Sequence, residues 1–216
     1  MQNKKITHAK NSIFLFSYLL IVWGFYRFLF ELPEPVTELF VKPVLWLVPL
    51  FIILRRERAS FKDLGFTTEN LFTAVYFALS LGAFFAVEGL IVNILKHGGL
   101  NFGSAIGENT FIVALLLSTV TAVVEEVTFR GYLFGRAWKI LGNEWIANLL
   151  IGIGWTFVHM PVAIFVWQLG AGELFGFSLI TLSFGVGAGF VYAKTKNILS
   201  PILLHVLWQW PIILFR

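Results

Sequence analysis

The chain has 216 residues, of which 58% are apolar, 17% aromatic and only 13% charged. Soluble domains carry about 25% charged residues, so this composition, with a mean hydropathy of +0.82, predicts a membrane protein. The absence of cysteine excludes thiol nucleophiles, disulfides and cysteine-ligated metals, and a single aspartate, Asp63, excludes an aspartate dyad within one chain.

Seven apolar runs are close in length to the roughly 20 residues that span a hydrocarbon core about 30 Å thick. They cover residues 13–30, 37–54, 71–95, 110–129, 146–167, 174–193 and 198–215. The first lacks a small-x-small cleavage site and is long for a signal peptide, so we interpret it as a retained anchor. The second is interrupted by Lys42 and Pro43, and residues 132–141 could form an extra helix, so six to eight spans are compatible. We predict an all-α, polytopic transmembrane helical bundle of about seven spans.

The basic residues of the loops predict the orientation of this bundle. If the N-terminus is cytoplasmic, eleven basic residues lie in cytoplasmic segments and four on the opposite side. The eleven are Lys4, Lys5, Lys10, Arg55, Arg56, Arg58, Lys62, Arg136, Lys139, Lys194 and Lys196, and the four are Arg27, Lys42, Lys96 and Arg216. This bias predicts a cytoplasmic N-terminus and an external C-terminus. It also explains the net charge of +4 without a nucleic-acid partner.

Several polar or ionisable side chains fall inside the predicted spans, where they usually face a protein interior or a water-filled cavity. They are Glu88, Glu125, Glu126, Arg130, His159, His205 and Gln209. Glu88 has no neighbour of this kind on its own run, so we interpret it as a structural or pore-facing acid. The others come from three runs, and we predict that they converge on one cavity in the cytoplasmic half to the middle of the membrane.

Helical spacing sorts these residues into faces. Glu126 and Arg130 are four residues apart and can form an ion pair on one face. Glu125 points about 100° away from Glu126, which leaves it free of that partner. The same spacing of four joins two further pairs, Trp155 with His159 and His205 with Gln209.

Such a set of residues predicts hydrolytic chemistry. A carboxylate in an apolar cavity can act as a general base on water. Two neutral imidazoles can orient that water, bind a metal or stabilise an oxyanion, and an amide can donate to the same oxyanion. The H-E-x-x-H and G-x-S-G motifs of other membrane proteases are absent from the sequence.

Four segments resemble motifs of the CPBP family, which includes the CAAX prenyl endopeptidases and the bacteriocin-immunity (Abi) proteins. They are E-E-V-T-F-R-G at 125–131, W-T-F-V-H at 155–159, H-V-L-W-Q at 205–209 and D-L-G-F at 63–66. Two positions depart from the family pattern: tryptophan replaces phenylalanine at 155, and glutamine replaces asparagine or aspartate at 209. The resemblance covers roughly residues 60 to 212. It implies an N-terminal anchor region of two transmembrane helices at 1–59 and a catalytic membrane core at 60–216.

The resemblance also implies roles for individual residues. Glu125 would activate water, while His159 and His205 would position it or stabilise the tetrahedral intermediate. The supporting residues would be Glu126, Arg130 and Gln209. Family members are described both as metal-dependent and as glutamate-type proteases. Two histidines and one glutamate could hold Zn²⁺, but a metal-free site requires no further assumption, and we favour it while leaving the cofactor open.

We therefore expect an intramembrane endopeptidase that cleaves a membrane-associated protein or peptide. It would be an integral multi-pass protein, in the plasma membrane if the cell is bacterial. The alternative is a catalytically silent relative that acts by binding, in self-immunity or in assembly. A third hypothesis is a haem or ion carrier with His159 and His205 as ligands.

Overall fold

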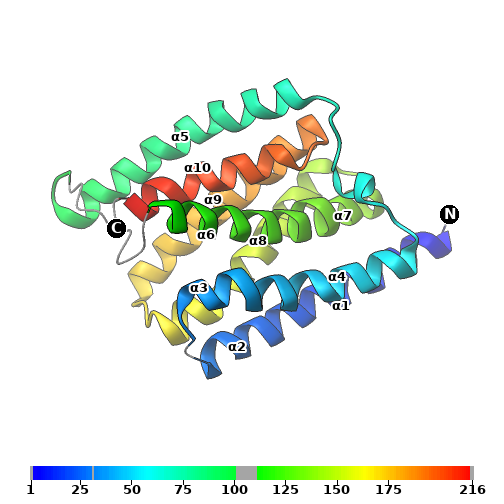
Figure 1. Ribbon diagram of the computed structural model, residues 1–216, viewed down its shortest axis with the longest axis horizontal. Helices are drawn as coiled ribbons and strands as arrows, with labels where there is room; N and C mark the ends of the chain where they lie inside the picture. Colours follow the sequence, from blue (N-terminus) through cyan, green and yellow to red (C-terminus); the bar gives the residue numbers. More distant parts are fainter. Residues whose placement is uncertain (1, 31, 101–110, 215–216) are drawn as a thin grey trace.

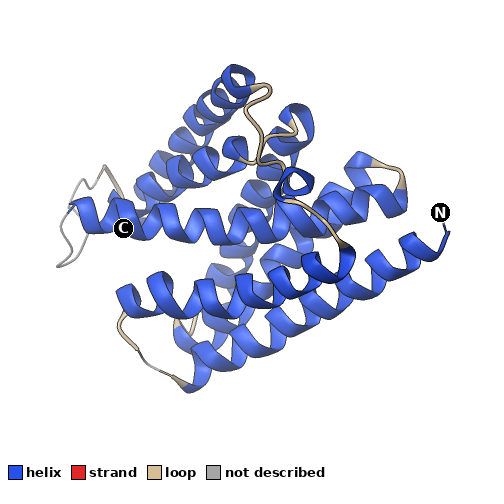
Figure 2. Ribbon diagram, turned by 45° about the vertical axis from the view of Figure 1, so that its right-hand side comes forward, coloured by secondary structure: helices blue, strands red, loops and turns tan. Residues whose placement is uncertain are grey.

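A computed structural model describes residues 2–30, 32–100 and 111–214, and all regular secondary structure in these ranges is helical (Figure 2). Arg216, which was counted in the charge argument, lies outside the described residues. The helices run roughly along one long axis and form a bundle (Figure 1). The predicted all-α membrane bundle is confirmed.

Six helices within the described ranges are long and apolar enough to cross a bilayer. They are Lys4–Leu29, Glu34–Glu57, Leu71–Leu95, Ile112–Leu141, Glu144–Val166 and Ala171–Thr195. A shorter apolar helix, Leu199–Gln209, lies within the last helix, α10 (Leu199–Leu214). The prediction of about seven spans agrees with this arrangement.

Four of these spans are built from helical segments that follow one another without a break, and three of the four contain three segments each. The first comprises α1 (Gln2–Tyr18), the π-helical η1 (Leu19–Trp23) and α2 (Gly24–Leu29). The second comprises α3 (Glu34–Val36), the π-helical η2 (Thr37–Val41) and α4 (Lys42–Glu57). The fourth comprises α6 (Phe111–Glu126), the π-helical η4 (Val127–Phe134) and α7 (Gly135–Leu141).

The remaining helices complete the bundle. The third span is α5 (Leu71–His97), the fifth is α8 (Glu144–Pro161) with the π-helical η5 (Val162–Val166), and the sixth is α9 (Ala171–Thr195). A short 3-10 helix, η3 (Phe61–Leu64), lies in the connection between α4 and α5.

Two expectations from the sequence are wrong. Residues 132–141 form no separate helix, because η4 and α7 continue α6 into one helix of 30 residues. Lys42 is not a loop residue of the external side but lies inside the second span and is 4% exposed. Pro43 does not break that span, since α4 continues the π-helical η2 without interruption at this residue.

Small residues let α8 and α9 approach closely, as the G-x-x-x-G at 185–189 indicates. A Cβ atom on Gly185 would lie 3.2 Å from the Cα of Gly152. One on Gly189 would overlap the Asn148 amide, whose Nδ2 donates to the Val186 carbonyl at 2.9 Å. Gly185 therefore lies directly against the helix that carries Trp155.

The leucine-glycine segment at 63–66 packs against the glycine of the E-E-x-x-x-R-G segment, Gly131. Gly65 has φ 89°, and a Cβ there would lie 2.8 Å from Tyr192 Cε2, so only glycine fits. A Cβ on Gly131 would lie 3.0 Å from the Leu64 carbonyl oxygen. The segment at 63–66 and the glycine that follows E-E-x-x-x-R are thus in direct contact, which explains why both are small or turn-forming.

A capping box fixes η3 in front of this contact. The Ser60 backbone N–H donates to Asp63 Oδ2 at 2.8 Å, and the Ser60 hydroxyl donates to the same atom at 3.0 Å. The backbone hydrogen bond lowers the pKa of the Asp63 carboxyl.

The helix ends that carry most of the eleven basic residues lie at one end of the bundle. Figure 1 shows the N-terminal end of α1, the end of α4, the start of α5, the end of α7 and the α9–α10 connection on its right-hand side. These helix ends therefore lie together, as the charge argument requires, and the assignment of this end to the cytoplasm stays a prediction.

Candidate active site

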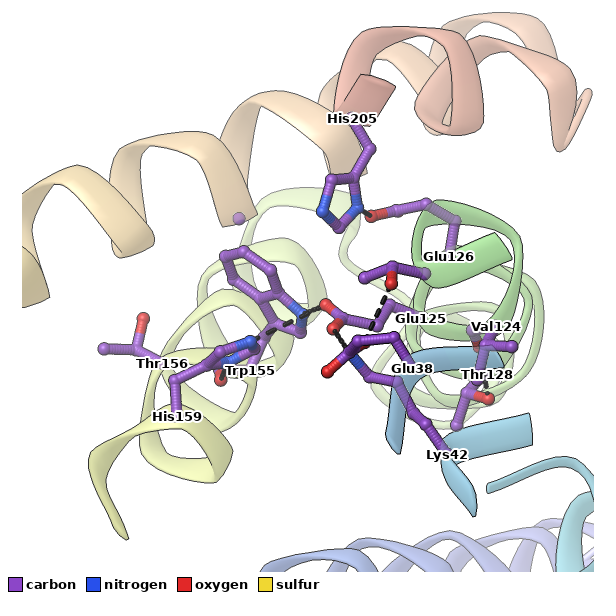
Figure 3. A network of polar contacts seen from close by, with 12 residues as sticks. Glu38, Lys42, Val124, Glu125, Glu126, Thr128, Trp155, Thr156, His159 and His205 are labelled. Atoms are coloured by element: carbon purple, nitrogen blue, oxygen red, sulfur yellow. Dashed lines mark hydrogen bonds and ion pairs between the residues drawn. The ribbon is translucent and has the colours of Figure 1, made fainter. Parts of the chain in front are cut away.

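Two adjacent glutamates at the end of α6 belong to two different polar networks (Figure 3). Both side chains are buried, at 2% and 0% exposure for Glu125 and Glu126. The π-helical η4 begins at the next residue, and all eight of its residues are buried. Wide helical turns of this kind often occur at functional sites, where they redirect side chains.

Glu125 lies between a lysine of the second span and two aromatic side chains of the fifth. Lys42 Nζ is 2.6 Å from its Oε1, and the Trp155 indole Nε1 donates to its Oε2 at 2.9 Å. His159 Nε2 lies 3.7 Å from the same Oε2. Because Trp155 and His159 are one turn apart on α8, a single helix face holds both against the carboxylate.

Glu126 points to a different side of α6 and binds an arginine and a histidine through one oxygen. Arg130 Nη1 donates to Oε1 at 3.0 Å, which confirms the predicted pair, and His205 Nδ1 contacts the same atom at 2.7 Å. Arg130 Nη2 donates to the Gly185 carbonyl at 3.1 Å. This network ties α6, α9 and α10 together, and it leaves Glu126 Oε2 buried with no hydrogen-bond partner among the described residues.

The tautomer of His159 follows from its neighbours. Its Nδ1 lies 2.8 Å from the Trp155 carbonyl oxygen, which can only accept, so Nδ1 carries the proton. In the neutral ring Nε2 is then an acceptor that faces another acceptor, Glu125 Oε2, across 3.7 Å. A water molecule that donates one proton to each atom satisfies both. With its side chain 22% exposed, His159 is the most accessible member of this network.

His205 is fixed more tightly than His159. It is 1% exposed and packs against aromatic rings, with centroid distances of 4.7 Å to Phe184, 5.9 Å to Trp155 and 6.0 Å to Trp208. Its Nδ1 must donate, because the carboxylate of Glu126 accepts.

Gln209 and Glu88 lie outside the two glutamate networks. The Ser118 hydroxyl donates to Gln209 Oε1 at 2.5 Å, and Ser118 lies eight residues before Glu126, about 12 Å along the helix. Gln209 therefore lies about two turns along α6 from the two glutamates. Glu88 is half-buried on α5, and its Oε2 has no hydrogen-bond partner among the described residues.

Sequence reasoning missed three residues of the Glu125 network. Lys42 and Glu38, 2.7 Å apart, come from the second span, and the Thr121 hydroxyl of α6 donates to Glu38 at 2.8 Å. The spacing of four between Glu38 and Lys42 is the same signal that identified Glu126 and Arg130, but it was read as loop charge. Trp155 was identified from the sequence only as a departure from the family pattern one turn before His159, whereas its indole donates to Glu125.

The donor set does not form a zinc site. Zinc requires three protein ligands at about 2.0–2.2 Å for nitrogen and oxygen. The two histidines here face different carboxylates, and the described residues contain no group of three or more histidine, aspartate or glutamate side chains that could hold a metal ion.

Comparison with known proteins gives one family. The model of a family described as type II CAAX prenyl endopeptidase Rce1-like matches residues 107–211. The matched segment contains both glutamates, Arg130, both histidines and Gln209, and it leaves out Glu38 and Lys42. No curated protein and no solved structure matches the chain.

Proposed function

Because residues 107–211 match the model of the type II CAAX prenyl endopeptidase family, we propose that this multi-pass membrane protein is an intramembrane endopeptidase of the glutamate type. It would hydrolyse a peptide bond in a membrane-associated protein or peptide, and in a bacterial cell it would act in the plasma membrane. The observation that carries the proposal is that two acceptor atoms, His159 Nε2 and Glu125 Oε2, face each other 3.7 Å apart, so that one water molecule beside them can donate a proton to each.

The proposed first step is the attack of that water on the scissile carbonyl. Glu125 Oε2 takes one proton of the water, and the oxygen forms a bond to the carbonyl carbon. His159 Nε2 accepts the second proton in a hydrogen bond and so orients the attacking lone pair. The product of this step is a tetrahedral intermediate with a negative oxygen and a neutral Glu125 carboxyl.

The second step breaks the carbon–nitrogen bond. Glu125 returns its proton to the leaving nitrogen, and the intermediate collapses to a carboxyl group and a free amine. We propose that His205 stabilises the oxyanion of the intermediate by a hydrogen bond from Nε2 when its ring is cationic. Glu126 accepts from Nδ1 of this ring and stabilises its positive charge, in the way that a buried carboxylate orients a catalytic histidine.

Arg130 and Gln209 would act at a greater distance from the reacting atoms. Arg130 neutralises Glu126, and its guanidinium lies 5.0 Å from the centre of the Trp155 ring, so it supports both networks. Gln209 would support the position of α10 through its hydrogen bond with Ser118.

The test compares three forms of the protein in the native host at equal abundance: wild type, Glu125→Gln and Glu88→Gln. New N- and C-termini in the membrane and secreted fractions are identified by mass spectrometry. Removal of a general base lowers the rate by about 10²–10⁴-fold, so termini produced by wild type should disappear with Glu125→Gln. They should persist with Glu88→Gln, a matched intramembrane variant outside both networks.

Identical profiles for wild type and Glu125→Gln would contradict the proposal. If Glu125→Gln also rescued the phenotype of a deletion strain, the protein would act by binding, without catalysis. A Soret band in protein purified after haem supplementation would instead support the haem carrier.

A further inference from the structure

A buried lysine beside the proposed base comes from outside the family segment. Lys42 is 4% exposed at bilayer depth, where an uncompensated ammonium group costs several kcal/mol. It is compensated here by Glu125 Oε1 at 2.6 Å and by Glu38 Oε2 at 2.7 Å. The Trp23 and Trp46 rings, with centroids 5.3 and 5.6 Å from Nζ, complete its surroundings.

Residues of the second span and of α6 hold this lysine in position. Glu38 lies one turn before it on the same span and is fixed to α6 by the Thr121 hydroxyl at 2.8 Å. Thr121 lies one turn before Glu125 on α6. The second span is therefore joined to α6 by two carboxylate bridges that meet at one ammonium group (Figure 3).

We propose that Lys42 is the positioning residue of Glu125 and that Glu38 keeps the lysine paired during the reaction. This inference rests on the proposed function. Lys42 binds Oε1 of Glu125, which leaves Oε2 on the side of Trp155 and His159, where water would be activated. The N-terminal helices thus supply a part of the site and are more than an anchor.

The charges of the three residues explain why a second carboxylate is needed. Before the reaction two carboxylates and one ammonium carry a net charge of −1. When Glu125 takes the proton of water, the negative charge moves to the tetrahedral intermediate. Glu38 still neutralises Lys42 at that stage, so no buried cation is left unpaired. The proton then leaves with the amine and the pair with Glu125 forms again.

The experiment uses the full chain in proteoliposomes and a peptide that spans a cleavage site identified by the comparison of termini. Lys42→Met removes the charge and keeps an apolar side chain of similar length. Lys42→Met alone changes the net charge of Glu38, Lys42 and Glu125 from −1 to −2. The double variant Glu38→Gln, Lys42→Met restores −1, so it remains informative if the single variant fails to fold. Lys42→Arg retains a cation, and Glu125→Gln gives the background rate.

We expect the double variant to lower kcat by about 10²-fold, the loss caused by a displacement of about 1 Å at a reacting group. KM should change by less than about threefold, because Lys42 contacts no substrate in this proposal. Lys42→Arg should recover part of kcat, and the thermal midpoint of the double variant should stay near that of wild type.

Two results would overturn this inference about Lys42 without affecting the proposed function. One is a double variant with the kcat of wild type, and the other is a kcat that falls only in proportion to the folded fraction, which would make Lys42 purely structural. Failure of the proposed function is distinguishable, since wild type would then cleave no faster than Glu125→Gln.

Discussion

Two buried glutamates, Glu57 at the basic end of the bundle and Glu125 near its middle, differ in how completely their oxygens are bound. Glu57 Oε1 accepts from Asn11 at 2.9 Å and from the Tyr132 hydroxyl at 2.8 Å, and it pairs with His8 at 3.0 Å. Its Oε2 pairs with Arg136 Nε at 2.9 Å.

The oxygens of Glu125 have fewer partners. One pairs with Lys42 and the other accepts from Trp155, while His159 lies beyond hydrogen-bond distance at 3.7 Å. The comparison shows that burial and ion pairing alone do not distinguish a structural carboxylate from the proposed general base. What distinguishes them is a remaining acceptor position on Glu125 Oε2, which faces His159 Nε2 within reach of one bridging water molecule.

The largest expected effect that sharpens this comparison is a loss of stability on replacement of Glu57. Glu57→Ala leaves the guanidinium of Arg136 buried and unpaired and removes the contact among α1, α4 and α7. Breaking a buried ion pair in this way costs about 3–5 kcal/mol, so the free energy of unfolding, measured by SDS titration in mixed micelles, should fall by that order. Proteolytic activity per folded molecule should stay near wild type.

The opposite outcome for Glu57→Ala, full stability with lost proteolysis, would show that Glu57 is part of the reactive site and would remove the distinction between the two glutamates. Glu88→Ala is the control, because Glu88 is half-buried on α5 and forms no ion pair with the described residues.

A smaller effect is expected at the indole that binds Glu125. Trp155→Phe introduces the aromatic residue typical of the family and removes the N–H donated to Oε2. Hydrogen bonds to charged groups contribute about 1.5–3 kcal/mol, which corresponds to a loss of roughly tenfold to a hundredfold in kcat. Steady-state kinetics on the identified peptide would measure it.

Unchanged kinetics in Trp155→Phe would mean that the indole N–H does not orient the carboxylate during the reaction. Trp145→Phe is a matched control, since Trp145 is exposed at the start of α8, ten residues before Trp155, and belongs to neither network.

The smallest effect is expected at Asp63, outside the membrane spans. The Ser60 N–H lowers the pKa of this carboxyl in the folded protein, so the unfolded chain binds the proton more readily. The stabilisation is therefore complete above the unfolded pKa and is lost as the pH falls through the lower, folded pKa. Asp63→Asn should lower the thermal midpoint slightly at pH 7, and the difference from wild type should vanish once the pH falls below the folded pKa, which lies under the ordinary value for aspartate.

An equal difference between wild type and Asp63→Asn at both pH values would contradict this assignment. It would mean that the side-chain shape, and not the ionised carboxylate, caps η3.

Much of the fold could be predicted because apolar runs near 20 residues and basic loops are local signals. The pair of Glu126 with Arg130 could also be predicted, since a spacing of four places both on one helix face. The place of Lys42 in the site could not be predicted, because a single lysine next to a proline is typical of the end of a span. Only its partners, Glu38 and Glu125, show that it is buried inside one. The separation of Gln209 from the two glutamates was equally invisible, since it depends on how α10 lies along α6.

The sequence by itself therefore determined the membrane environment, the approximate number of spans and the set of residues able to do chemistry, because these depend on composition and on spacing within single helices. Only the tertiary structure decided which partner each residue has: Lys42 and Trp155 for Glu125, Arg130 and His205 for Glu126. The physical reason is that an ion pair between helices depends on their relative rotation and displacement. Those are decided by the packing of all the helices together.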